Sequence, residues 1–282
     1  MSKILTLSSF LFLISVIATG CSQPQTQDSL NKQSSNTPIR STIEINTPIG
    51  FERVKCDTND VGFFLRQLSF KEDKTVYLFN GEEKRNQDAQ YAVLDIDIGK
   101  RDLQQCADAV MRLRAEFLFK QKLYDQIRFH FTSGDLATWQ KYSEGYRPVI
   151  NGNSVSWVKS ADSDTSYSNY RKYMDLIFTY CGTASMSKEL EMISINEIKP
   201  GDVLHVTGNP YGHAVTIMDV ARDSLGRTAV ILSQSYMPAQ SIHILVNPNN
   251  SESSPWYILK ENEPIRTPEW TFPATSKKRW KG

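Results

Sequence analysis

The sequence predicts an α+β fold, with helices in the first half of the chain and an antiparallel sheet in the second half. Two observations lead to this prediction. Before about residue 180, apolar residues recur at helical spacing in several segments, whereas from Val203 onward short β-rich runs alternate with turn residues. Strands joined by short turns pair in antiparallel fashion, and helices that precede such strands are typical of an α+β domain.

The first half contains the helices that position most of the polar candidates. A short helix is expected at 60–68 and a long one at 103–124. Asp102 is the predicted N-cap of the long helix, and Gln105 completes a capping box. The other expected elements are strands at 75–79, 92–98 and 128–132 and helices at 135–142 and 167–180.

The second half predicts a meander of strands. They are expected at 203–207, 213–221, 228–235, 242–246 and 256–260. The turns between them are short, so each strand is expected to pair with the next one along the chain.

The N-terminus predicts a lipoprotein. Lys3 precedes an apolar run from Ile4 to Ala18, and Gly20-Cys21 follows directly, which is typical of a signal peptide that ends in a lipobox. The run is short for a membrane span, which needs about 20 apolar residues. We therefore expect residues 1–20 to be removed and Cys21 to be lipidated. Ser22 in place of Asp favours the outer membrane of a bacterial cell envelope.

The chain beyond the lipid is expected to have two parts. Residues 21–48 are rich in Ser, Gln, Asn, Thr and Pro and hold few large apolar residues, which predicts a flexible tether. Residues 49–282 have apolar residues throughout, without repeats or a second polar break, and are expected to form one domain.

Charge and motifs exclude several function classes. The chain has 32 Lys and Arg and 31 Asp and Glu, and removal of residues 1–20 removes only Lys3 from these, which leaves no net charge. This balance argues against a nucleic-acid partner and leaves the lipid as the membrane contact. The sequence has no phosphate loop, dinucleotide fingerprint or paired-cysteine spacing, so we expect neither an organic cofactor nor a metal.

Three cysteines remain after Cys21: Cys56, Cys106 and Cys181. An envelope compartment permits disulfides, and an odd count leaves at least one thiol free. A Cys56–Cys181 bond would spare Cys106, although the sequence does not establish this pairing. Cys181 lies near the C-terminal end of its helix, where the dipole disfavours a thiolate, so a structural or disulfide-bonded role is expected.

Cys106 is the candidate nucleophile. It lies in the first turn of the predicted long helix, where free N–H groups and the helix dipole favour an anion and lower the pKa of a thiol. The alternative is a small core residue, because Leu103, Val110 and Leu113 share its helical face.

His213 is the candidate partner of Cys106. It begins a largely apolar predicted strand, and a turn at 223–226 places residue 236, give or take two, opposite it on the next strand. Gln234 lies in that window and is the candidate orienting residue, with Ser235 and Tyr236 as alternatives. The N–H of Cys106 and the amide of Gln104 or Gln105 are candidate oxyanion donors.

The other histidines have a simpler interpretation. His130, His205 and His243 each alternate with apolar neighbours and are expected on polar faces of their strands. No two histidines have the spacing of a zinc site, which would need distant ligands.

The chain resembles an uncharacterised family of bacterial lipoproteins over about residues 49–270. The residues that carry the resemblance are 101–109 (RDLQQCADA), 201–203 (GDV), 212–215 (GHAV), 234–240 (QSYMPAQ) and 267–270 (TPEW). This resemblance implies no activity.

A more distant resemblance does imply an activity. A cysteine at a helix N-terminus, then Gly-Asp and an apolar residue, then Gly-His on a strand, looks like the NlpC and CHAP branches of the papain-like cysteine hydrolases, which cut amide bonds in bacterial cell walls. The resemblance implies a papain-like fold, with Cys106 as nucleophile, His213 as general base and Gln234 as the orienting residue. The expected function is an envelope-anchored cysteine hydrolase that cleaves an amide, with a peptidoglycan stem peptide as candidate substrate. A non-catalytic binding or scaffold protein is the alternative.

Overall fold

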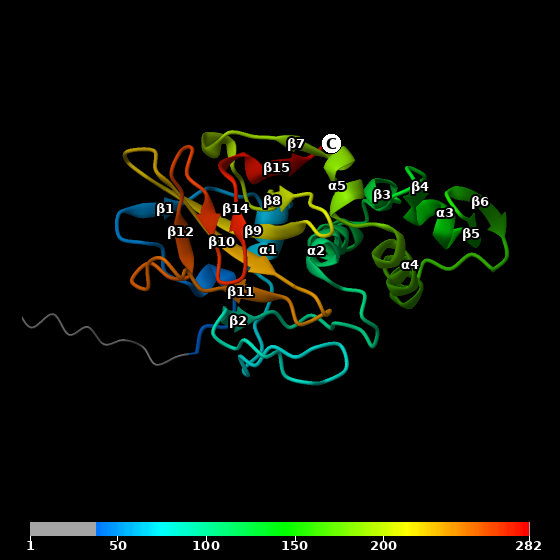
Figure 1. The fold of residues 1–282 in the computed structure, drawn as a ribbon, viewed down its shortest axis with the longest axis horizontal. Helices are drawn as coiled ribbons and strands as arrows, with labels where there is room; N and C mark the ends of the chain where they lie inside the picture. Colours follow the sequence, from blue (N-terminus) through cyan, green and yellow to red (C-terminus); the bar gives the residue numbers. More distant parts are fainter. Residues whose placement is uncertain (1–37, 282) are drawn as a thin grey trace, which may run out of the picture. The chain divides into compact units, whose positions relative to one another are not determined.

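The computed structural model describes residues 38–281, which form one compact unit that begins at Pro38 (Figure 1). The predicted signal peptide, Cys21 and residues 21–37 of the predicted tether lie outside the described residues. Residues 38–48 include a short 3-10 helix, η1 (Thr42–Glu44), and Ile45 is buried in the core.

A nine-stranded antiparallel sheet dominates the structure. Its path runs β2-β11-β10-β9-β8-β15-β7, and in addition β1 pairs with β9 and β12 pairs with β10. The strands are β1 (Phe51–Arg53), β2 (Gln90–Val93), β7 (Leu190–Met192), β8 (Val203–Val206), β9 (His213–Asp223), β10 (Thr228–Gln234), β11 (His243–Leu245), β12 (Trp256–Ile258) and β15 (Lys277–Trp280).

Five helices are present in the described residues, and most are short. They are α1 (Val61–Arg66), α2 (Cys106–Lys120), α3 (Trp139–Ser143), α4 (Tyr167–Tyr180) and α5 (Thr183–Glu189). Three further 3-10 helices are η2 (Tyr124–Gln126), η3 (Ile195–Glu197) and η4 (Ala274–Ser276). Six other strands form hairpins: β3 (Arg128–His130) with β4 (Leu136–Thr138), β5 (Tyr146–Asn151) with β6 (Ser154–Lys159), and β13 (Ile265–Arg266) with β14 (Thr271–Phe272).

The predicted fold class is therefore wrong. The structure is mostly antiparallel sheet, α4 and α5 lie in the second half of the chain, and residues 38–281 do not form a papain-like arrangement. Two causes stand out. The sheet recruits β1 and β2 from the first half of the chain, and much of the segment between α2 and α4 forms hairpins.

Both faces of the central strands are buried, which explains why the sequences of β9 and β10 are almost continuously apolar. On one face, α1 and α2 pack over Met218, Ala229 and Ile231. On the other face, β13 and β14 and the segment around Ile198 pack over Val215 and Leu232. A sheet that is covered on both faces needs apolar side chains at consecutive positions.

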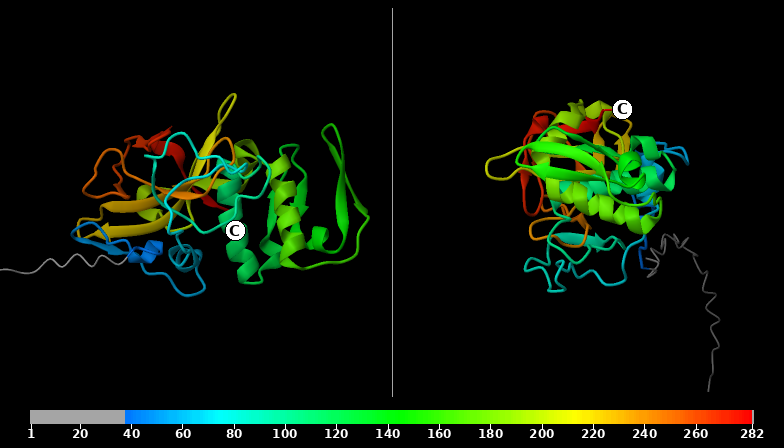
Figure 2. Two further views of the ribbon diagram at one scale, coloured as in Figure 1. Left: turned by 90° about the horizontal axis from the view of Figure 1, so that it is seen from below. Right: turned by 90° about the vertical axis from the view of Figure 1, so that its right-hand side faces the viewer.

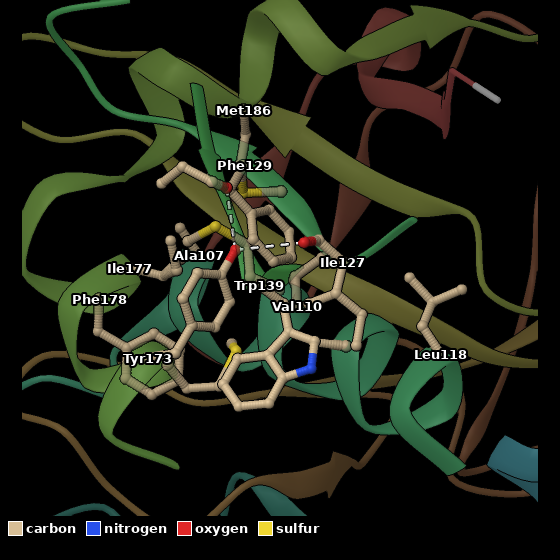
Figure 3. Close-up of a cluster of buried hydrophobic side chains, with 14 of the residues drawn as sticks. Ala107, Val110, Leu118, Ile127, Phe129, Trp139, Tyr173, Ile177, Phe178 and Met186 are labelled. Atoms are coloured by element: carbon tan, nitrogen blue, oxygen red, sulfur yellow. Dashed lines mark hydrogen bonds between the residues drawn. The ribbon is translucent and has the colours of Figure 1, made fainter. Parts of the chain in front are cut away.

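A third cluster joins α2 to β3, β4, α3, α4 and α5 beside the sheet (Figures 2 and 3). Trp139, Phe129 and Ile177 are fully or almost fully buried there. The Tyr173 hydroxyl, labelled in Figure 3, is buried too, and it donates a hydrogen bond to the carbonyl of Ala137 at 3.0 Å. Helix α2 packs both in this cluster and against the sheet, where it contacts β9.

No helix within the described part of the chain has the length and apolar character needed to cross a bilayer. Cys56, Cys106 and Cys181 are all free thiols, so the structure does not contain the Cys56–Cys181 bond that the sequence left open. The Cys181 thiol instead donates to the carbonyl of His130 at 3.2 Å.

Candidate functional site

Cys106 is the first residue of α2. The helix begins three residues later than predicted, and Gln105, not Asp102, is its N-cap. The Gln105 N–H donates to the Asp108 carboxylate at 3.0 Å, while the Gln105 side chain donates to Asp102 at 3.0 Å. The predicted capping box of Asp102 and Gln105 is therefore wrong: their contact joins two side chains before the helix, and the capping box is formed by Gln105 and Asp108.

The Cys106 thiol is buried, with 9% of the residue exposed. Burial and then the charge of Asp108 raise the pKa of Cys106 to about 11, although the N–H groups of Ala107, Ala214 and Cys106 itself lower it. The helix N-terminus was expected to lower the pKa below its ordinary value, and this expectation is wrong because burial outweighs it. The thiol is protonated at neutral pH.

His213 opens β9, directly beside the start of α2. Its Nε2 lies 3.1 Å from Oε1 of Gln234, the last residue of β10. Ser233 pairs with Thr216 in this hairpin, which puts residue 236 opposite residue 213 as predicted. His213 and Gln234, which are 21 positions apart in the chain, are thus brought together by the hairpin register.

Aromatic rings surround the His213 imidazole. The centroids of Tyr236 and Trp270 lie 4.9 Å from that of His213, and Phe272 stacks at 5.5 Å. Burial lowers the pKa of His213 to about 4, although Gln234 and Glu269 act in the opposite direction. The imidazole is neutral at pH 7.

Two cavities meet at Cys106. The first, of about 250 Å³, is also lined by His213, Tyr236 and Trp270. The second, of about 220 Å³, is also lined by Asp108. The residues shared by both are Cys106, Pro210, Tyr211, Gly212 and Met237. A larger cavity of about 710 Å³ around residues 247–266 contains neither Cys106 nor His213.

Gly212, the residue before His213, lies very close to β8 and α5. A Cβ at this position would lie 2.2 Å from the Val206 carbonyl oxygen and 2.7 Å from Oγ1 of Thr183. Any side chain would therefore push the loop away from β8 and α5. This explains why a glycine precedes the histidine.

Behind Gln234 lies a chain of polar groups that the sequence did not predict. The Gln234 Nε2 donates to Oε2 of Glu269 at 2.7 Å and lies 3.4 Å from Nε2 of His243. Lys84 pairs with Glu269 at 2.6 Å. Glu269 lies in the TPEW segment quoted above, which was the only signal for it, while Lys84 and His243 gave none.

The remaining candidates are placed as follows. The Ser235 hydroxyl lies 2.8 Å from the carbonyl of Gln104, so it points away from His213, whereas Tyr236 packs on the imidazole. The Gln105 side chain is held by Asp102. The Gln104 side chain accepts from Arg112 at 3.1 Å, and its Nε2 is buried without a partner among the described residues.

His205 and His243 are buried, so the expectation that they lie on polar faces is wrong. Each sits on a strand with both faces covered, and each bonds to a carbonyl, of Thr183 and Ser241 respectively. His130 is partly exposed and lies 3.3 Å from Glu189. Within residues 38–281, no three His, Cys, Asp or Glu side chains are arranged to hold a metal ion.

Comparison with curated proteins and with solved structures found no match. A family model does match, and it covers residues 41–279, which include every candidate residue of this site. The chain therefore belongs to the family described as domain of unknown function (4846).

Proposed function

We propose that the protein is a cysteine hydrolase that cleaves an amide bond, with Cys106 as nucleophile and His213 as general base and acid. One observation carries the proposal: Cys106 and His213 line the same cavity, while the far nitrogen of His213 is held by Gln234. A nucleophile, a base and a group that orients the base are the elements that acyl transfer by cysteine requires.

The neutral thiol and imidazole define how the reaction would start. His213 takes the proton of the Cys106 thiol as the sulfur attacks the carbonyl carbon, and the N–H of Cys106 at the helix N-terminus faces the developing oxyanion. The protonated His213 then gives its proton to the leaving amine as the C–N bond breaks. Water, deprotonated by His213, attacks the acyl-enzyme and releases the acid and the thiol.

The substrate class follows from the expected location. The lipobox at Cys21 supports an envelope protein on a lipid anchor, and Ser22 favours the outer membrane. The amide bonds of peptidoglycan stem peptides are the substrate that this location favours. Each of the two cavities is large enough for a small group, one on either side of the scissile bond.

A second candidate is a non-catalytic binding or scaffold protein. The observation that favours it is the burial of the Cys106 thiol, which raises its pKa to about 11. In this case Cys106 is a core residue, and substitution of Cys106 by Ser changes stability and nothing else.

The test is acylation by a simple activated ester. A protein that consists of residues 38–282 is incubated with p-nitrophenyl acetate. Mass spectra of the intact protein and of its peptides follow the acetyl group over time. We expect acetylation of Cys106 that later decays as the acyl-enzyme is hydrolysed. Cys106→Ser should abolish the adduct, and His213→Gln should slow it by about 10²-fold or more, the usual contribution of general base catalysis.

Cys56→Ser is the matched control, because Cys56 is a free thiol that lies outside both cavities. This variant should be acetylated at Cys106 like the unaltered protein. If Cys106 stays unmodified in the folded protein, or reacts at the same rate with and without His213, the hydrolase proposal fails and the binding protein is favoured.

A further inference from the structure

We propose that Glu269 is a positioning residue: it fixes the orientation of the Gln234 amide and thereby the protonated nitrogen of His213. The inference rests on the proposed function for its importance in catalysis, but the arrangement of protons that it predicts is measurable without any substrate.

The Glu269 carboxylate restricts how the Gln234 amide can be oriented. An ionised carboxylate only accepts hydrogen bonds, so the atom of Gln234 that lies 2.7 Å from Glu269 must be the amide nitrogen. The oxygen of the same amide then faces His213, at 3.1 Å from Nε2. An amide oxygen only accepts, so His213 must carry a proton on Nε2.

His243 supports the same orientation. Its Nδ1 lies 2.9 Å from the Ser241 carbonyl, which accepts, so the neutral ring carries its proton on Nδ1. Its Nε2 is left as an acceptor, and the nearest amide atom is again Nε2 of Gln234, at 3.4 Å. Both N–H groups of the Gln234 amide thus face acceptors.

Lys84 and Asn86 hold the Glu269 carboxylate in place. The Lys84 ammonium lies 2.6 Å from Oε2 of Glu269, and the Asn86 amide donates to Oε1 at 3.1 Å. The Lys84 and Glu269 side chains are 8% and 15% exposed, and Gln234 is 1% exposed. In such a dry environment, an inverted amide would leave buried polar atoms unpaired, which is strongly unfavourable.

The consequence concerns the second nitrogen of His213. When a neutral imidazole is protonated on Nε2, Nδ1 has a lone pair and can accept a proton. No hydrogen bond joins Nδ1 of His213 to another of the described residues, and the imidazole lines the cavity that contains Cys106. Glu269 thus keeps Nδ1 as a base for the Cys106 thiol, although it touches neither substrate nor thiol.

The test measures the protonated nitrogen directly. The protein is labelled with ¹⁵N-histidine, and long-range ¹H–¹⁵N spectra at pH 7.5 distinguish protonated from unprotonated ring nitrogens. The signals of His213 are assigned with His213→Gln among the four histidines of the chain. In the unaltered protein we expect a proton on Nε2 and none on Nδ1 of His213. A proton on Nδ1 overturns the proposal, and this result needs no variant.

The variant is Lys84→Met combined with Glu269→Gln, which removes both charges together and keeps similar side-chain lengths. We expect His213 to populate both tautomers and Cys106 acetylation to slow by about tenfold or more, because the wrong tautomer cannot act as base. The matched control is Lys260→Met with Glu263→Gln, an exposed ion pair 3.3 Å apart that lies away from the site.

The outcomes separate this inference from the proposed function. If the double variant keeps the Nε2 proton on His213 as fully as the control, Glu269 does not position it and the inference fails. If the tautomers mix while neither protein acetylates Cys106, Glu269 positions His213 as inferred and only the hydrolase proposal fails.

Discussion

At the scale of single residues, two opposing effects act on Cys106, and their magnitudes differ. A helix N-terminus stabilises a negative charge by about 0.3–1 kcal/mol. Burial and Asp108 raise the pKa of the thiol from 9.0 to about 11, which corresponds to roughly 2.7 kcal/mol against the thiolate. Burial therefore wins, and the position of Cys106 in a helical first turn does not by itself make the thiol reactive.

This balance predicts the pH dependence of Cys106 alkylation in the free protein. The rate with iodoacetamide should rise about tenfold for each pH unit up to about pH 11, because the thiolate is the reacting species. Peptide mass spectrometry of the folded protein measures the rate at Cys106 separately from Cys56 and Cys181. A rate that levels off at or below pH 8 would show that the thiol is activated in the free protein.

The sequence predicted that Gln234 lies next to His213, but it did not reveal Glu269, because the two residues reach the site in different ways. The partner of His213 lies on the adjacent strand, so counting residues across a short turn was sufficient to find it. Glu269 reaches Gln234 from a segment after β13, and no register connects that segment to β10. Lys84 comes from the loop before β2, which is equally remote in sequence.

At the scale of elements, a bulge in the β9–β10 hairpin changes which side chains share a face. The register shifts between Ile231 and Leu232, so alternation along β9 does not continue from His213 to Asp219. Asp219 is instead buried among Arg53 and Arg66, at 2.6 Å from each, as a structural ion-pair cluster.

The elements between α2 and α4 were hard to predict. Residues 135–142 were expected to be helical, but Leu136–Thr138 forms a strand and the helix begins only at Trp139. The segment is short and carries apolar residues that suit both states, so packing in the cluster of Figure 3 decides the outcome. The helix at 167–180 was confirmed because its apolar periodicity extends over four turns.

The loop before β9 gives the element-scale prediction. Gly212→Ala places a methyl group 2.2 Å from the Val206 carbonyl, which should displace the loop and lower the free energy of unfolding by about 1–3 kcal/mol. Urea unfolding measures the loss, and the acetylation assay should show slower reaction at Cys106. Gly182→Ala is the comparison, because a Cβ there has no neighbour within 4 Å. An equal effect of both substitutions would contradict the steric explanation.

At the scale of the whole molecule, Gly201-Asp202 joins distant parts of the chain. Gly201 has a φ of +93°, and Asp202 accepts two hydrogen bonds from Arg279 of β15, at 2.8 and 2.7 Å. The motif therefore links the start of β8 to β15, the last strand, and does not take part in the site. As a sequence signal it correctly marked the start of β8, but its physical role is structural.

The buried histidines predict how overall stability depends on pH. Burial lowers the pKa of His205, His213 and His243 to about 4, below the value of about 6.5 in an unfolded chain. As the pH falls from 6.5 towards 4, the unfolded state binds protons that the folded state does not. Each histidine then removes about 1.4 kcal/mol of stability per pH unit.

Thermal and urea unfolding between pH 7.5 and 4.5 check this prediction. His205→Gln removes one titrating group, so its stability should fall less steeply with decreasing pH than that of the unaltered protein. Identical slopes for the two proteins would show that His205 does not bind a proton on unfolding in this range.

The two cavities at Cys106 share walls from two loops, 207–212 between β8 and β9 and 235–242 between β10 and β11. The thiol, the imidazole and the Gln234 amide come from the ends of α2, β9 and β10, whereas Tyr211 and Met237, which line both cavities, are exposed loop residues. In the proposed hydrolase, selectivity and chemistry would thus be encoded in separate parts of the chain. Relatives that differ in these two loops would admit different molecules to the same thiol, and exchanging the loops between them would transfer that preference.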